Sequence, residues 1–259
     1  MKRLVLSFLV CATGLATQAQ VTKLSEGFTS GKTVWMVRAG ASLNGASGDG
    51  VDATKDDWEK GKWDGSFGRA LGGNVSIGFN KSFGSSPLYW GMELGAAMRG
   101  YKTSADWGKS ASSTVAGSRI YDSHTKTQTT TLNAYNAQLL PIIIGYKYLL
   151  NDKMAIDVHV GGFASYDFAG EIKSETSDHI YSYSSKYGTR DTNNEDSNTV
   201  KIGDLDGYRN YDFGAVGGVG LWFGHFNVGV SYQRGFISIF EGDNTYFCDK
   251  LQVRLGYAF

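Results

Sequence analysis

Residues 246–259, with the sequence YFCDKLQVRLGYAF, carry an alternation of side chains that decides the fold. Apolar residues occupy one parity, apart from Asp249, and polar or small residues occupy the other. Because successive side chains of a strand point to opposite faces, the pattern predicts a two-faced β-strand about as long as a tilted crossing of a bilayer. The apolar parity ends in two aromatics, Tyr257 and Phe259. We expect this strand to pair with the first strand of an outer-membrane β-barrel, so that no backbone edge is left in lipid.

The composition of the whole chain suits a single β-domain. Its 259 residues include 35 Gly, 15 Tyr and 14 Phe but only 2 Pro. Abundant Gly with aromatics is typical of a barrel that packs small residues inside and rings at its rims. The mean hydropathy is -0.26, and no apolar run reaches the roughly 20 residues that a membrane helix needs. The formal net charge is zero, so no nucleic-acid partner is predicted.

Residues 1–19 have the organisation of a secretory signal peptide. A positive start and an apolar core over residues 2–15 precede a small residue at Ala19, where cleavage is expected. We therefore exclude this segment from the fold. Residues 20–32 are expected to form a periplasmic lead-in, and residues 33–259 the barrel.

The two cysteines predict no disulfide. Cys11 lies in the expected signal peptide and leaves open a lipoprotein alternative, but the residue before it is Val10 rather than a small one. Removal of the signal peptide leaves Cys248 alone, and a lone cysteine forms no internal disulfide. We expect Cys248 to pack as a small side chain near the outer rim of the barrel.

Two-residue alternation predicts eight antiparallel strands. Their expected ranges are about 33–43, 71–83, 88–99, 131–150, 154–167, 211–223, 226–233 and 246–259. The parity is unclear around Pro141, because proline has no backbone N–H to give to a ladder, and we predict a bulge there.

The connections between these strands predict the orientation of the barrel. Long polar stretches at 44–69, 100–130 and 168–209 alternate with tight turns, and an intermediate loop lies at 234–245. Outer-membrane barrels place long loops outside the cell and short turns in the periplasm. We therefore expect long extracellular loops and periplasmic N- and C-termini.

Aromatic residues fall near both ends of the predicted strands, as they do at the two interfaces of a bilayer. The turn ends hold Trp35, Phe83, Trp90, Tyr146, Phe223, Phe226, Tyr257 and Phe259, and the loop ends hold Tyr135, Phe168, Tyr211, Tyr232 and Tyr246. Outer-membrane lipids are therefore predicted partners. The alternative is a water-soluble barrel of the lipocalin sort, whose apolar face would point inward around a ligand.

Three segments resemble the PorT-like outer-membrane β-barrel family, one of the small OmpA/OmpX-type eight-stranded barrels. They are LLPIIIGYKY at 139–148, DFGAVGGVG at 212–220 and RLGYAF at 254–259. The resemblance implies an outer-membrane address and a terminal aromatic that the barrel-insertion machinery reads during biogenesis. It implies no shared catalytic residue.

Charged residues on the inward parity predict an internal ionic layer. Arg38, Glu93, Asp157 and Arg254 lie a few residues from the turn ends of their strands, so they are expected to share one layer in the periplasmic half, with His159 just above and Arg99 higher. Eight strands leave an interior only wide enough for side chains. We expect salt bridges that plug the lumen; the alternative is a gate for a narrow water or ion path.

A catalytic role is not favoured by the histidines. His159 as a base would need a Ser and an acid at hydrogen-bond distance on a lipid-accessible surface, and it is expected to face the lumen. His124 and His179 are expected in loops without a fixed partner. We therefore predict no enzyme, no catalytic residue and no cofactor, and modification of lipid A or phospholipid is the alternative.

The long loops are the remaining candidates for function. Their acidic clusters, at residues 49–59 and 191–206, lack the spacing of a calcium loop, so no metal is predicted. Their aromatics are expected either to contact a surface protein or glycan or to pack the loops together. These residues are Trp58, Trp63, Trp107, Tyr181, Tyr183 and Tyr187. The sequence thus predicts a structural or surface-interaction barrel.

Overall fold

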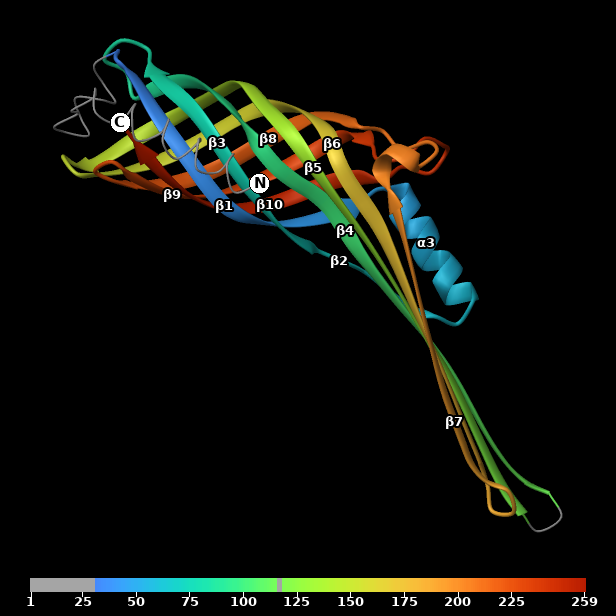
Figure 1. The fold of residues 1–259 in the computed structure, drawn as a ribbon. Coiled ribbons are helices and arrows are strands. Elements are labelled where there is room, and N and C mark those ends of the chain that lie inside the picture. The colour runs from blue at the N-terminus through green and yellow to red at the C-terminus, as the bar shows by residue number, and fades with distance from the viewer. Residues whose placement is uncertain (1–30, 116–117) are drawn as a thin grey trace, which may run out of the picture.

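The computed structural model of the chain describes residues 31–115 and 118–259 (Figure 1). Eight strands close into an antiparallel ring that confirms the predicted all-β barrel. They are β1 (Thr33–Ser47), β3 (Ala70–Ser82), β4 (Leu88–Val115), β5 (Ser118–Asn151), β6 (Met154–Ser184), β8 (Tyr211–Phe223), β9 (Phe226–Ser238) and β10 (Phe247–Ala258). The expected signal peptide and most of the expected lead-in lie outside the described residues.

The barrel closes between its first and last strands, as residues 246–259 predicted. β10 pairs antiparallel with β1, from Met36 opposite Ala258 to Ser47 opposite Phe247. Every other neighbour in the ring is the preceding or following barrel strand in sequence. The topology is therefore up-and-down, and the closed ladder leaves no strand edge within the barrel wall.

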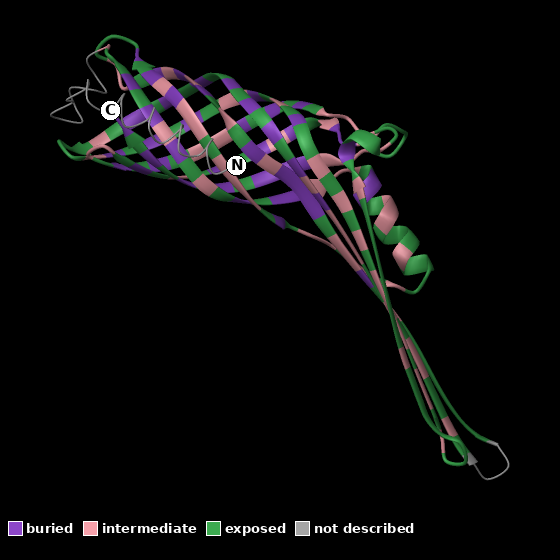
Figure 2. Ribbon diagram, viewed as in Figure 1, coloured by how far each residue is buried: buried purple, intermediate pink, exposed green. Residues whose placement is uncertain are grey.

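Buried and exposed residues alternate along the strands of the barrel wall (Figure 2). Many of the exposed side chains are large and apolar, whereas the buried ones include many polar and charged residues. From Leu251 onward, β10 alternates between exposed and buried residues, so that Leu255 is 64% exposed while its neighbour Arg254 is 6% exposed. This alternation confirms the predicted parity. Two of the expected rim aromatics depart from it, because Phe259 is buried after the end of β10 and Tyr246 turns inward over the barrel.

We call the end of the barrel with the short hairpins the turn end and the opposite end the arm end. The turn end holds the connections from β3 to β4, β5 to β6 and β8 to β9, together with the C-terminus. The predicted bulge near Pro141 is confirmed by register shifts between Leu139 and Ile142 on β5 and between Gly91 and Glu93 on β4.

The prediction of long irregular loops is wrong, because most of the residues in these segments continue the sheet beyond the barrel. β4, β5 and β6 run on past the wall, and β7 (Gly188–Lys201) pairs with the end of β6. These four strands form a long twisted sheet, which we call the arm (Figure 1). The arm shows no alternation of apolar and polar side chains, because both of its faces meet water. Its strands are rich in Thr, Tyr and Asn, and their backbone N–H and C=O groups are paired in the ladders between neighbouring strands.

The first predicted loop, residues 44–69, also contains regular structure. It forms α3 (Asp49–Lys60) and the short strand β2 (Asp64–Gly68), which pairs with β4. A single 3-10 turn, η2 (Ile202–Asp204), follows β7. No helix in the described part of the chain is both long and apolar enough to cross a bilayer.

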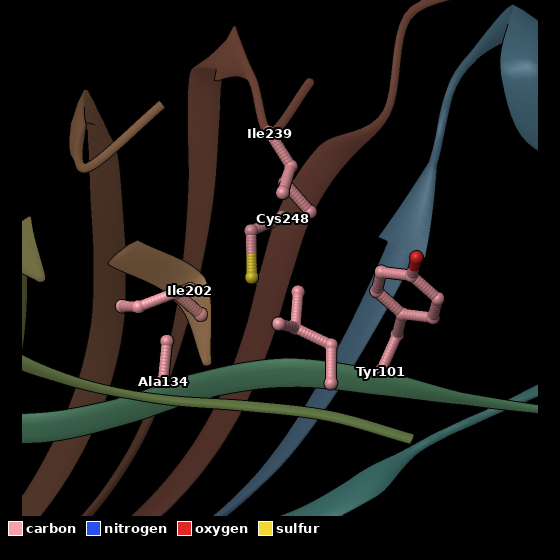
Figure 3. Close-up of a cluster of buried hydrophobic side chains, with 6 residues drawn as sticks. Tyr101, Ala134, Ile202, Ile239 and Cys248 are labelled. Atoms are coloured by element: carbon pink, nitrogen blue, oxygen red, sulfur yellow. The ribbon is translucent and has the colours of Figure 1, made fainter. Parts of the chain in front are cut away.

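Side chains fill the barrel in alternating apolar and charged layers. Going along β6 from the turn end, Ala155 lies in an apolar cluster with Trp222 and Phe163 lies in a second apolar cluster. A third apolar cluster closes the arm end (Figure 3), where Cys248 packs with the side chains Tyr101, Leu132, Ala134, Ile202 and Ile239. Cys248 is thus a buried free thiol near this rim, as predicted. Charged residues occupy the two levels between these clusters.

Candidate functional site

Three inward-facing residues of the predicted ionic layer meet in direct contact near the turn end. Glu93 of β4 is 1% exposed and lies between Arg38 of β1 and Arg254 of β10. One carboxylate oxygen accepts a hydrogen bond from Arg38, and the other accepts from Arg254 Nη1 at 2.9 Å and from Ser76 Oγ at 3.2 Å. We call these four residues the Glu93 cluster. Two cations share one anion, so the cluster carries a surplus positive charge.

A second carboxylate lies at nearly the same level of the barrel. Asp157 accepts a hydrogen bond from the Tyr89 hydroxyl at 2.7 Å, and its other oxygen lies 2.7 Å from His159 Nδ1. The Lys147 ammonium lies over the rings of Tyr89 and Trp222, at 4.4 and 4.8 Å from their centroids. The negative charge of Asp157 therefore offsets cations that the wall holds away from water.

Nearer the arm end, Arg99 organises a separate ionic cluster. Its guanidinium donates to Asp167 Oδ2 and to the backbone carbonyl of Arg209, both at 2.6 Å, and lies 3.7 Å from Asp212. Tyr208 also donates to Asp167, at 2.5 Å. Burial raises the pKa of Tyr208, so its hydroxyl keeps the proton that it donates. The Arg99 cluster thereby ties the segment before β8 to the inside of the wall.

The structure therefore divides the interior residues that the sequence grouped together. Arg38, Glu93 and Arg254 are in contact, Asp157 and His159 form a neighbouring pair, and Arg99 belongs to the other cluster. Sequence reasoning missed the partners Tyr89, Lys147, Asp167, Tyr208 and Asp212. Lys147 follows the bulge, where the parity was unclear, and Asp167 and Asp212 lie at predicted strand ends. The inward parity of Asp212 with Trp222 was the signal that could have found it.

The histidines are placed differently from the expectation in two cases. His124 and His179 do have partners, because their Nε2 atoms lie 2.5 Å from Asp178 and 2.8 Å from Asp191. Both pairs lie on the arm, where each histidine and its aspartate are diagonal neighbours on adjacent strands. His159 is buried within the lumen. Across the described residues, no cluster of three or more His, Cys, Asp or Glu side chains is arranged to hold a metal ion.

A cavity of about 510 Å³ opens at the arm end, between α3, β2, β4, β5 and the connection from β9 to β10. We call it the arm-base pocket. Aromatic rings form two walls: Trp58, Phe67 and Tyr101 follow one another at centroid distances of 5.5 and 5.9 Å, and Phe240 and Tyr246 lie 6.0 Å apart. Its other lining residues are Thr54, Thr103, Ala105, Gln128, Thr130, Glu241, Gly242, Asp243 and Asn244.

One face of α3 fixes this pocket against the connection before β10. Gly50, Thr54 and Trp58 are spaced by four residues, so they share a face of the helix. The Gly50 amide donates to the Thr245 carbonyl at 3.0 Å, and the Thr54 hydroxyl lies 3.0 Å from the Tyr246 hydroxyl. A Cβ on Gly50 would collide with the Tyr246 ring. Only the smallest residue therefore allows this close approach of the helix.

The predicted loop aromatics occupy three different settings. Trp58 lines the arm-base pocket, whereas Trp63 packs against Trp107, with ring centroids 6.5 Å apart. Tyr181 packs against Tyr121 on the arm, at 6.1 Å. Tyr183 also lies on the arm, partly exposed, and Tyr187 is 83% exposed at its tip. Sequence reasoning missed the pocket residues Phe67, Tyr101, Phe240 and Tyr246, which come from separate segments.

The arm is a continuous sheet up to its tip. The backbone amide of Arg119 donates to the Ser185 hydroxyl, and the Ser185 amide donates to the Arg119 carbonyl, both at 3.1 Å. These bonds join the β4–β5 hairpin to the β6–β7 hairpin. Leu132 is the β5 residue of the arm-end apolar cluster that lies nearest to the arm tip. From Leu132 to Ser118 at the tip, β5 has a length of about 45 Å, at roughly 3.3 Å per residue.

Three solved structures resemble this fold at low sequence identity. Ail, the attachment invasion locus protein of Yersinia pestis, was solved in complex with the heparin analogue sucrose octasulfate; it is 12% identical, with a TM-score of 0.30 over 88% of this chain and 99% of Ail. Neisserial surface protein A is 11% identical, with a TM-score of 0.33 over 87% of this chain and 97% of its own. The translocator domain of the autotransporter NalP from Neisseria meningitidis is 14% identical, with a TM-score of 0.25 over 98% of each chain. We draw no functional conclusion from similarities at this level.

No curated protein matches the chain in sequence. The model of the outer membrane protein beta-barrel domain matches residues 18–241, a range that includes every barrel strand from β1 to β9. The chain therefore belongs to the outer membrane protein beta-barrel domain family, and it is an integral protein of the outer membrane.

Proposed function

We propose that this outer-membrane barrel has a non-enzymatic surface role and that its arm is the part that meets a partner. The arm carries the proposal, because a polar four-stranded sheet about 45 Å long is not needed to close the barrel. Its faces present hydroxyl, amide and charged groups, with tyrosines toward the tip. Such a surface suits a protein or glycan partner. The finer resemblance to PorT-like barrels stays a prediction.

The proposed role requires the arm end to face the outside of the cell. Long connections at one end and short hairpins at the other support this orientation, with both termini in the periplasm. Cysteines introduced one at a time at Tyr187 and at Asn151 test it, because these positions lie at the arm tip and in a hairpin of the turn end, whereas the native Cys248 is buried. A membrane-impermeant maleimide should label Tyr187→Cys on intact cells and Asn151→Cys only after lysis. The reverse pattern would contradict the proposed orientation.

The register of the arm allows a clean truncation that tests the surface role. Asp106 pairs with Thr127, Thr127 with Ser177, and Ser177 with Glu195, so the four strands can be cut at one level. In the truncated variant, Asn-Gly turns replace residues 107–126 and 178–194. The barrel portions of the strands and every residue that lines the arm-base pocket are kept in this variant.

Full-length and truncated proteins would each be used as bait on native outer membranes solubilised in mild detergent. We expect partners that co-purify with the full-length protein to be missing from the truncated one, while both still migrate as folded barrels. If the two proteins retain the same partners, the arm is not the interacting surface.

The lumen weighs against the alternative of a narrow channel. Three apolar clusters and two charged levels fill the barrel, and the cavity beside Arg99 has a volume of only about 10 Å³. A lipid-modifying enzyme remains the third alternative. A shift in the mass of lipid A in cells that express the protein would support it.

A further inference from the structure

The arm-base pocket has the size and the ring arrangement of a small-molecule site. Its volume of about 510 Å³ is within the range of roughly 300–1,000 Å³ that is typical of ligand pockets. The wall of Trp58, Phe67 and Tyr101 comes from α3, β2 and β4, and the wall of Phe240 and Tyr246 comes from the connection between β9 and β10. The pocket therefore offers ring faces from segments that the fold holds in place.

The polar lining residues restrict the charge of a ligand. Glu241 and Asp243 contribute carboxylates, while Gln128 and Asn244 contribute amides. Hydroxyl groups come from three threonines, and the residues that line the pocket include no Lys or Arg. Glu241 lies 3.8 Å from Arg209, which does not line the pocket, so the charged groups of the lining itself are carboxylates. They disfavour phosphates, sulfates and carboxylates, because like charges repel.

This combination matches the chemistry of a sugar ring. A pyranose has an apolar face of C–H groups, which stacks on an aromatic ring, and hydroxyl groups around its edge. Amide side chains donate and accept hydrogen bonds with those hydroxyls, and carboxylates accept hydrogen bonds from them. A purely apolar ligand would leave the amides and carboxylates unpaired, which costs free energy.

We propose that the arm-base pocket binds an uncharged sugar ring against the aromatic rings that line it. The physiological meaning rests on the proposed surface role of the arm end, but the binding itself does not. The truncated variant described above keeps Thr103, Ala105, Gln128 and Thr130, so it keeps the pocket lining. It should bind sugar as the full-length protein does, and the two proposals can therefore fail independently.

Binding would be measured by titration calorimetry and by tryptophan fluorescence on the purified protein, in a detergent without a sugar headgroup. The neutral probes are cellobiose, lactose and chitobiose, and the polyanionic probe is sucrose octasulfate. We expect at least one neutral disaccharide to bind with a Kd below about 10 mM, and sucrose octasulfate to bind at least about tenfold more weakly. The proposal is overturned if none of the three neutral sugars binds, or if the polyanion binds as tightly.

Variants separate the pocket from other aromatic surfaces. Trp58→Ala removes one stacking ring and should weaken binding about tenfold, whereas Trp107→Ala, which lies outside the pocket, should leave the affinity within about twofold of wild type. Asp243→Asn changes an exposed residue outside the barrel strands, and it should weaken binding severalfold. Wild-type affinity in both Trp58→Ala and Asp243→Asn would overturn the proposal.

The same sugar chemistry occurs in free glycans and in the glycolipid of the outer membrane itself. Titrations in nanodiscs with and without lipopolysaccharide distinguish these sources. Weaker apparent binding of the free disaccharide in the presence of lipopolysaccharide would identify the membrane glycolipid as the occupant. Equal binding in both nanodiscs would exclude the membrane glycolipid as the occupant.

Discussion

Glu93 is the residue on which the packing of the lower lumen depends. Its carboxylate contacts two guanidinium groups from strands at opposite ends of the sequence, β1 and β10, next to the seam where the barrel closes. A buried charge is costly unless it is paired, so the three charges stabilise the barrel only as a set.

Glu93→Gln should therefore destabilise the barrel by about 3–5 kcal/mol, because Arg38 and Arg254 lose the carboxylate that lies between them and pairs with both. Chemical unfolding in detergent micelles measures the change. Ser76→Ala is the matched control, since it removes only one hydrogen bond to the same carboxylate and should cost about 1 kcal/mol. Equal losses of stability in the two variants would mean that pairing with the two arginines contributes no more than the single hydrogen bond from Ser76.

At the scale of elements, α3 is held by a contact that admits no side chain. Gly50 lies against the Tyr246 ring, and the helix positions Trp58 over the arm-base pocket two turns later. The other face of the helix carries acidic and basic residues toward solvent.

Gly50→Ala should loosen α3 from the barrel, because overpacking at a tight contact costs about 1–3 kcal/mol. Limited trypsin digestion should then cut after Lys55 and Lys60 faster than in the wild type. Gly203→Ala is the control, since a Cβ at Gly203 would meet no atom within 4 Å. Unchanged cleavage of α3 in Gly50→Ala would show that the Tyr246 contact does not hold the helix.

Sequence alone predicts the barrel but not the arm. Alternation in β10 is visible because one face meets lipid and the other meets packed side chains. The arm strands meet water on both faces, so their residues carry no apolar period and resemble loops. The acidic segment of α3 likewise has few apolar positions, which made residues 49–60 resemble a solvated loop.

Of the candidate sites, the Glu93 cluster could be predicted from the sequence and the arm-base pocket could not. Arg38, Glu93 and Arg254 share the inward parity of long, regular strands, so their meeting follows from the barrel topology. The arm-base pocket brings Phe67 and Tyr246 together across most of the sequence, from a five-residue strand and an irregular connection. No local pattern marks such a pair, because their proximity arises only when the barrel closes.

At the scale of the whole molecule, the alternating layers make the barrel a filled cylinder. The turn-end apolar cluster around Trp222 and the arm-end cluster around Cys248 lie on either side of the charged levels. Because apolar side chains enclose the charged levels on both sides, the lumen has no continuous water-filled path.

Planar-bilayer recordings should therefore be silent for the wild type and also for Arg254→Ala, because the apolar clusters remain in both proteins. Insertion of the protein into the bilayer would be checked by protease protection. Discrete current steps in Arg254→Ala but not in the wild type would instead identify Arg254 as part of a gate, and steps in both would identify an open channel.

The unbroken run of β5 and β6 from the barrel wall to the arm tip has a mechanical consequence. A partner bound at the tip would pull along the strand axes. The force would then load many interstrand hydrogen bonds at once, instead of breaking them one after another. The barrel and the arm would then behave as one stiff tether.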